Sequence, residues 1–200
     1  MQQVAIITDG SCELPGDLTN EYGIQIIPIT VTFEKLKESF QVAGPESSLS
    51  REEFYEKLKK DLPTTTPPDS KVFYDHFMKA SQEAETVIAI LVSKNVSKTY
   101  LHAKAVLSGI HDKDITLVDS MVGGPSLGLL VLEAAMLAKS GASKEEILTR
   151  LDNLIPQVAH ICIIDNLNNI YRSGRTSWLK KQLGQAFHVK PIILMQGGGT

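Results

Sequence analysis

The chain has 200 residues, of which 42% are hydrophobic and 22% are charged, and its formal net charge is −3. This composition is typical of a globular protein with a sizeable core, and the acidic balance argues against a nucleic-acid binder, which needs a basic face. The two cysteines are too few for a disulfide framework and lack metal-ligand spacing. No apolar run approaches the roughly 20 residues that span a bilayer, and the chain opens on a strand without an export signal, so we expect a cytoplasmic protein.

The first half of the chain alternates predicted strands and helices. Strands are predicted at 4–8 and 24–33, and Pro28 indicates an edge or a bulge in the second of them. Helices are predicted at 14–22, at 51–62 after the capping residue Ser50, and at 71–83, where Phe73, Phe77 and Ala80 would face the core. We interpret the segments 34–49 and 62–70 as loops.

The second half continues the alternation. A buried strand at 87–92 leads into a helix from Ser97 that Gly109 can end, and a strand follows at 115–118. The remaining predicted elements are helices at 127–139 and 145–155, the second with a Ser143–Glu146 capping box, strands at 158–164 and 189–195, and helical segments at 166–175 and 178–186.

This order of elements indicates an α/β fold with right-handed βαβ units and a parallel sheet over residues 1–155. The strands after Pro156 no longer alternate with long helices. We therefore expect a domain boundary there, with 156–200 as the start of a second unit that is shorter than a domain.

The stretch 87–100, VIAILVSKNVSKTY, combines a buried strand, a polar turn and a helix start. Such a junction directs backbone N–H groups and the positive end of a helix dipole to one point, which suits an anion. Ser97 and Thr99 add hydroxyl groups there, and Lys98 adds a positive charge. The alternative is that Ser97 only caps its helix.

Other predicted strands also end in small polar residues. Ser11 follows the first strand in the sequence Asp9-Gly10-Ser11, and Ser120 follows Asp119. Ligands of open α/β sheets bind outside the carboxyl ends of the strands, and the threonine loop at 64–66 could reach the same edge. These groups suit one small anionic or polar head group. The chain has no nucleotide phosphate loop and no histidine pattern for a metal, so we expect no cofactor.

One motif predicts a different function. The sequence Gly124-Pro-Ser126-Leu-Gly128 matches the G-x-S-x-G nucleophile elbow, with Asp165 and His188 following in the order of the α/β hydrolases. A true elbow turns directly off its strand, whereas residues 119–123 intervene here. A serine hydrolase using Ser126 is therefore an alternative hypothesis, beside a regulator that binds another small anion.

An ordered set of motifs resembles the DegV family along all 200 residues. They are ITDGS with LP, YGI, PITVTF, the threonine–proline loop, SKTY, VDS, GAS, and RSGR with KPI. Understood members are fatty-acid-binding subunits of bacterial fatty acid kinase. The resemblance implies a three-layer α/β domain followed by a second α/β domain, with one fatty acid held between them.

The resemblance also implies site residues and a partner. Thr65 and Ser97 match the two hydroxyl residues that bind the fatty acid carboxylate, and Arg172 and Arg175 match a turn at the pocket mouth, where we expect the kinase subunit to dock. The alternative is that the two arginines belong only to a solvated turn. The implied protein is a carrier and not an enzyme, compatible with transient membrane contact. The chain departs from the family at Lys98, where the family has glycine, at Thr66-Pro67, and in ending before most of the second domain. The large cation of Lys98 could pair with the carboxylate or block it.

Overall fold

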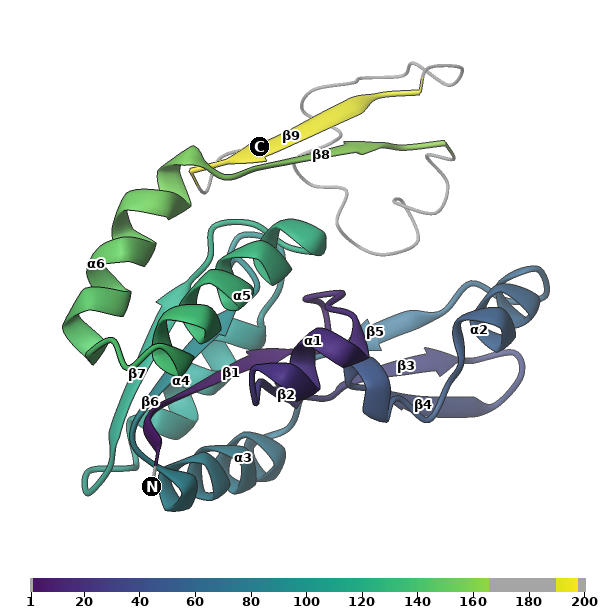
Figure 1. Ribbon diagram of the computed structural model, residues 1–200. Helices are drawn as coiled ribbons and strands as arrows, with labels where there is room; N and C mark the ends of the chain where they lie inside the picture. Colours follow the sequence, from purple (N-terminus) through teal and green to yellow (C-terminus); the bar gives the residue numbers. More distant parts are fainter. Residues whose placement is uncertain (1, 166–189, 198–200) are drawn as a thin grey trace.

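A computed structural model of the chain describes residues 2–165 and 190–197 (Figure 1). Its largest sheet has four parallel strands in the order β2-β1-β6-β7. They are β1 (Gln2–Asp9), β2 (Gln25–Ile27), β6 (Ala84–Leu91) and β7 (Asp114–Asp119). Residues 87–91 of β6 are fully buried, as their unbroken apolar run predicts for a central parallel strand. The predicted α/β fold with a parallel sheet is confirmed.

Helices cover both faces of this sheet (Figure 1). Successive strand residues point to opposite faces, so β1 and β6 each contribute to two cores. One core includes α3 (Ser70–Glu83) and α4 (Thr99–Leu107), and the other includes α5 (Pro125–Lys139) and α6 (Lys144–Leu154). The three α3 residues predicted to face the core are fully buried: Phe73, Phe77 and Ala80.

A second, antiparallel sheet has the order β4-β3-β5, and the sequence did not predict it. Pro28 ends β2, and the chain continues as β3 (Ile29–Phe33), which pairs with β4 (Glu38–Val42) and β5 (Thr64–Thr66). One predicted strand at 24–33 is thus two strands in different sheets, because proline cannot donate a ladder hydrogen bond.

The loops predicted at 34–49 and 62–70 are wrong in part, since they contain β4, β5 and a short 3-10 helix, η1 (Gly44–Glu46). Phe40 and Val42 of β4 pack with Phe33 and the partly buried Phe54 of α2 (Arg51–Leu58). This small core fixes the antiparallel sheet beside the main one.

Two helices begin at the predicted capping residues, Ser50 and Ser143, although α2 ends at Leu58 and not at the predicted residue 62. The Ser50 side chain accepts a hydrogen bond from the Glu53 N–H, and Ser143 forms a complete capping box with Glu146. The first helix, α1 (Gly16–Glu21), is also where it was predicted. No helix within residues 2–165 or 190–197 is long and apolar enough to cross a membrane.

After α6, the 3-10 helix η2 (Ile155–Gln157) leads to β8 (Ala159–Ile163), which pairs antiparallel with β9 (Ile192–Gln196). Both strands were predicted, whereas the helical segments predicted at 166–175 and 178–186 lie outside the described residues. The domain boundary near Pro156 stays a prediction.

Candidate functional site

Three strand ends that lie far apart in the sequence meet at one edge of the main sheet. β6 lies between β1 and β7, and all three run parallel, so Asp9, Leu91 and Asp119 end their strands side by side. The backbone crosses these ends too, since Ser120 N–H donates to the Leu91 carbonyl over 3.1 Å. The convergence of polar strand ends that the sequence predicts is therefore present.

Asp9 is the buried acid of this edge. One carboxylate oxygen accepts hydrogen bonds from the Ser11 N–H and hydroxyl, and the other accepts from the Val92 N–H at 2.8 Å. Burial raises the pKa of this carboxyl, against the lowering effect of those hydrogen bonds. Asp9 thus ties the end of β1 to the end of β6, and the Ser11 hydroxyl is engaged in that tie.

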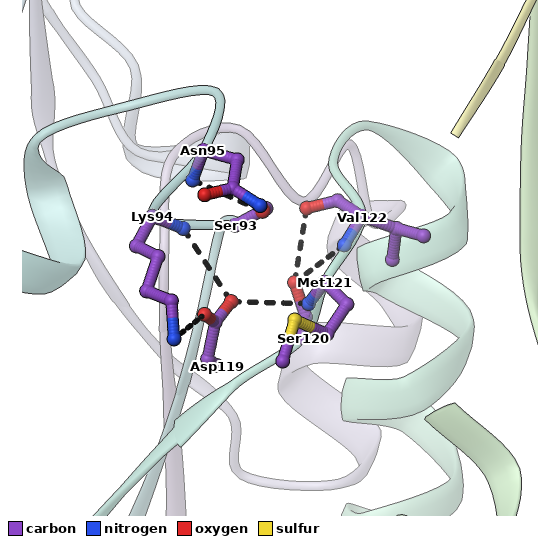
Figure 2. Close-up of polar contacts among 7 residues, drawn as sticks. All are labelled: Ser93, Lys94, Asn95, Asp119, Ser120, Met121 and Val122. Atoms are coloured by element: carbon purple, nitrogen blue, oxygen red, sulfur yellow. Dashed lines mark hydrogen bonds and ion pairs between the residues drawn. The ribbon is translucent and has the colours of Figure 1, made fainter. Parts of the chain in front are cut away.

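Asp119 closes the neighbouring turn (Figure 2). Its Oδ1 accepts from Met121 N–H at 3.1 Å and from Lys94 N–H at 3.4 Å, and its Oδ2 lies 3.4 Å from Lys94 Nζ. The fully buried Ser120 hydroxyl donates to the Val122 carbonyl at 3.0 Å. The Ser120 hydroxyl is therefore occupied in shaping the turn.

The anion site that the sequence predicts would lie at the start of α4. The helix begins one residue later than Ser97 predicts, because Lys98 occupies the N-cap position. Ser97 Oγ nevertheless accepts from the Thr99 N–H at 3.2 Å and lies 2.8 Å from the Thr99 hydroxyl. Thr99 is buried and Ser97 is partly exposed, so Ser97 offers the more accessible hydroxyl of the pair.

The two lysines near this helix start differ in their surroundings. Lys94 pairs with Asp119, as described above. Lys98 is exposed and has no ion-pair partner within residues 2–165 and 190–197. The N-terminal end of α4, where the first N–H groups have no partner within the helix, therefore has one uncompensated cation next to Ser97 in the sequence.

Thr65 comes from the antiparallel sheet, at the centre of β5. It lies opposite Val31 in the ladder and is exposed, whereas Thr64 and Thr66 point to the other face of the strand. Within the described residues, no group of three or more His, Cys, Asp or Glu side chains could hold a metal ion.

Comparison with known proteins identifies the family. Residues 3–200 match the family described as "Uncharacterised protein, DegV family". A DegV domain-containing protein of Caldanaerobacter subterraneus subsp. tengcongensis is 33% identical over 199 residues, which are 99% of this chain and 69% of that protein. The chain belongs to the DegV family.

Solved structures agree with this family fold. DegV of Bacillus subtilis, a fatty acid binding protein, is 27% identical, with a TM-score of 0.86 over 100% of this chain and 70% of that chain. A DegV family protein from Thermus thermophilus, whose structure concerns fatty acid binding, has a TM-score of 0.84 and is 24% identical, over 98% of this chain and 69% of that chain. The observed α/β architecture is thus that of the DegV proteins.

The G-x-S-x-G motif of this DegV chain lies at the start of α5, after a turn and not directly off β7. The structure explains both glycines of the motif, one by its backbone conformation and the other by close packing. Gly124 has a positive φ of 59°, and a Cβ at Gly128 would lie only 2.5 Å from the Cys12 carbonyl oxygen. The motif therefore serves the close approach of α5 to the loop after β1.

Ser126 itself is buried and contacts β8. Its hydroxyl donates to the Ala159 carbonyl at 3.1 Å and lies 3.2 Å from His160 Nδ1. A serine has one hydroxyl proton, and here it is donated to the Ala159 carbonyl. The contact with His160 is then satisfied if Nδ1 carries a hydrogen and donates it to the serine oxygen. A nucleophilic serine needs the opposite arrangement, with a bare histidine nitrogen to accept its proton. His188, the predicted triad histidine, lies outside the described residues, and Asp165 is exposed and pairs with Lys190.

Arg172 and Arg175, predicted to dock the kinase subunit, also lie outside the described residues. Sequence reasoning missed the structural roles of Asp9, Asp119 and His160. The first two residues stand at strand ends in the sequence, which was a usable signal, but their long-range partners, Val92 and Lys94, follow a different strand, β6. Nothing in the local sequence pairs His160 with Ser126.

Proposed function

We propose that this DegV chain binds a long-chain fatty acid and presents its carboxylate to a separate ATP-dependent fatty acid kinase. The observation that carries the proposal is the family match over residues 3–200, together with the likeness to the fatty acid binding DegV of Bacillus subtilis over the whole chain. The kinase partner follows from the family resemblance of the motifs. The chain would act as a carrier, and the kinase would form the acyl phosphate.

The proposed head-group site comprises the Ser97 hydroxyl, the first N–H groups of α4 and Thr65. Hydroxyl groups and backbone N–H groups are suitable donors for a carboxylate, and the positive end of a helix favours its charge. Ser11 and Ser120 would support this site by shaping the strand ends, since their hydroxyls donate to Asp9 and to the Val122 carbonyl. Arg172 and Arg175 are the proposed contacts with the kinase.

The energetics favour a carrier that obtains its affinity from the acyl chain. Each buried methylene contributes about 0.8 kcal/mol, so a long chain supplies on the order of 10 kcal/mol before ordering costs. A hydrogen bond to a charged carboxylate adds only about 1.5–3 kcal/mol. The chain would provide affinity, and the polar site would fix which end of the ligand faces the kinase.

The double variant Thr65→Ala/Ser97→Ala tests the site. We expect it to bind and retain fatty acid at least about a hundredfold more weakly than the wild type when the delipidated proteins are titrated with the acid, because two carboxylate donors are lost. The matched control is Thr64→Ala/Ser108→Ala, which removes one hydroxyl from the other face of β5 and one from the opposite end of α4. Equal retention by the test and control variants would refute this site.

A further inference from the structure

Lys98 holds an unusual position among the charges of the sheet edge. Lys98 is the N-cap residue of α4, and its side chain is exposed. Within residues 2–165 and 190–197, no carboxylate forms an ion pair with it. The nearby Lys94 differs, because Asp119 accepts from its backbone N–H and lies 3.4 Å from its ammonium. Of these two cations, Lys98 alone leaves its charge uncompensated in the described structure.

This uncompensated charge adds to the polarity of the helix start. The Lys98 backbone lies between Ser97 and Thr99, whose hydroxyls are 2.8 Å apart, and its carbonyl accepts the His102 N–H at 3.0 Å as the helix begins. The first N–H groups of a helix favour negative charge, and a positive side chain that starts from the N-cap residue would favour it further. A ligand at this helix start would therefore meet positive charge as well as hydrogen-bond donors.

We infer that Lys98 is a specificity-determining residue that makes this site prefer an ionised fatty acid over a neutral lipid of the same chain length. The inference rests on the proposed function, since it assigns a selectivity to the same site. The hydroxyls Ser97 and Thr65 can donate to an alcohol or to an acid alike. The Lys98 charge acts only on the ionised acid.

Because Lys98 is exposed, its effect is modest and sensitive to salt. An exposed ion pair corresponds to about a two- to fivefold change in affinity. The Debye length falls from about 30 Å at 0.01 M salt to about 3 Å at 1 M, so the preference for the acid shrinks as salt is added.

The test measures the affinities of delipidated protein for decanoic acid and for decan-1-ol, in Lys98→Met, Lys98→Arg and Lys104→Met variants. Lys104 is an exposed lysine near the other end of the same helix, so its loss changes the net charge equally. We expect Lys98→Met to lose about two- to fivefold in affinity for the acid and nothing for the alcohol. Lys98→Arg and Lys104→Met should keep the wild-type ratio of the two affinities.

An unchanged ratio in Lys98→Met, or an equal loss for acid and alcohol, would overturn the inference. An equal change in Lys98→Met and Lys104→Met would also overturn it, because the effect would then belong to net charge. Failure of the proposed function looks different, since the wild type itself would then bind neither probe.

Discussion

Asp9 shows how one residue organises the polar edge of the sheet. Its side chain is fully buried, accepts three hydrogen bonds, and connects the ends of β1 and β6. Burial without a cation partner disfavours the charged form, which is why its pKa lies above the ordinary value. The same residue that shapes the site therefore makes the stability of the fold depend on pH.

We predict that the stabilising contribution of Asp9 decreases as the pH rises. A raised pKa means that the folded protein holds this proton more tightly than the unfolded chain does. The stabilising contribution is therefore fully present at pH values below the pKa of the unfolded state, and it is lost as the pH rises through the higher pKa of the folded state. Urea unfolding of wild type and Asp9→Asn between about pH 4 and about pH 7 measures it, since asparagine does not titrate there.

The free energy of unfolding of wild type minus that of Asp9→Asn should fall over this range. The matched control is Asp17→Asn, which replaces an exposed acid in the first turn of α1. It gives the change in the free energy of unfolding with pH that the loss of an exposed carboxyl alone causes. A difference that rises with pH would show that Asp9 is instead stabilised in its charged form.

At the scale of elements, Ser126 joins α5 to β8. Its contacts with the Ala159 carbonyl and His160 link the main sheet's helix layer to the β8–β9 sheet. Ser126→Ala should lower the free energy of unfolding by about 1 kcal/mol, because the part-buried hydrogen bond to the Ala159 carbonyl is lost. Ser108→Ala, which removes an exposed local bond to the Ala105 carbonyl, is the control and should cost less.

The same variant separates this structural role from the hydrolase alternative. With its proton donated to Ala159, Ser126 should not react with a fluorophosphonate probe. Labelling of the wild type that disappears in Ser126→Ala, while Ser108→Ala still labels, would contradict the structural role and restore the hydrolase hypothesis.

The elements that sequence reasoning predicted are those with strong local patterns. The continuous apolar run of β6 and the Phe73 and Phe77 stripe of α3 identify their structures without any partner. β4 and β5 lack such signals. β4 is a short edge strand with several polar residues, and β5 consists of three threonines. Both strands therefore depend on pairing with β3, and for β5 this partner is distant in the sequence.

The candidate site likewise has features that the sequence predicts and features that it does not. Its position at the carboxyl edge was predictable, because parallel strands bring their ends together. The hydrogen bonds that occupy Ser11 and Ser120, and the pairing of Lys94 with Asp119, were not, since each depends on the exact geometry of a turn. The contrast between Lys94 and Lys98 emerges only from the structure.

At the scale of the whole molecule, the fold is a scaffold that gathers distant segments around one polar edge. The ends of β1, β6 and β7 meet through the main sheet, and the antiparallel sheet carries Thr65. The chain spans 69% of the length of the Caldanaerobacter relative and 70% of the DegV chain of Bacillus subtilis. We propose that this scaffold serves to bind a fatty acid.

Denaturing extraction of the purified wild-type protein, followed by mass spectrometry of the organic phase, tests that claim most directly. We predict a fatty acid in an amount close to one per protein, or, in protein purified without lipid, the same occupancy after incubation with oleic acid. A folded protein that yields no fatty acid in either preparation would contradict the account.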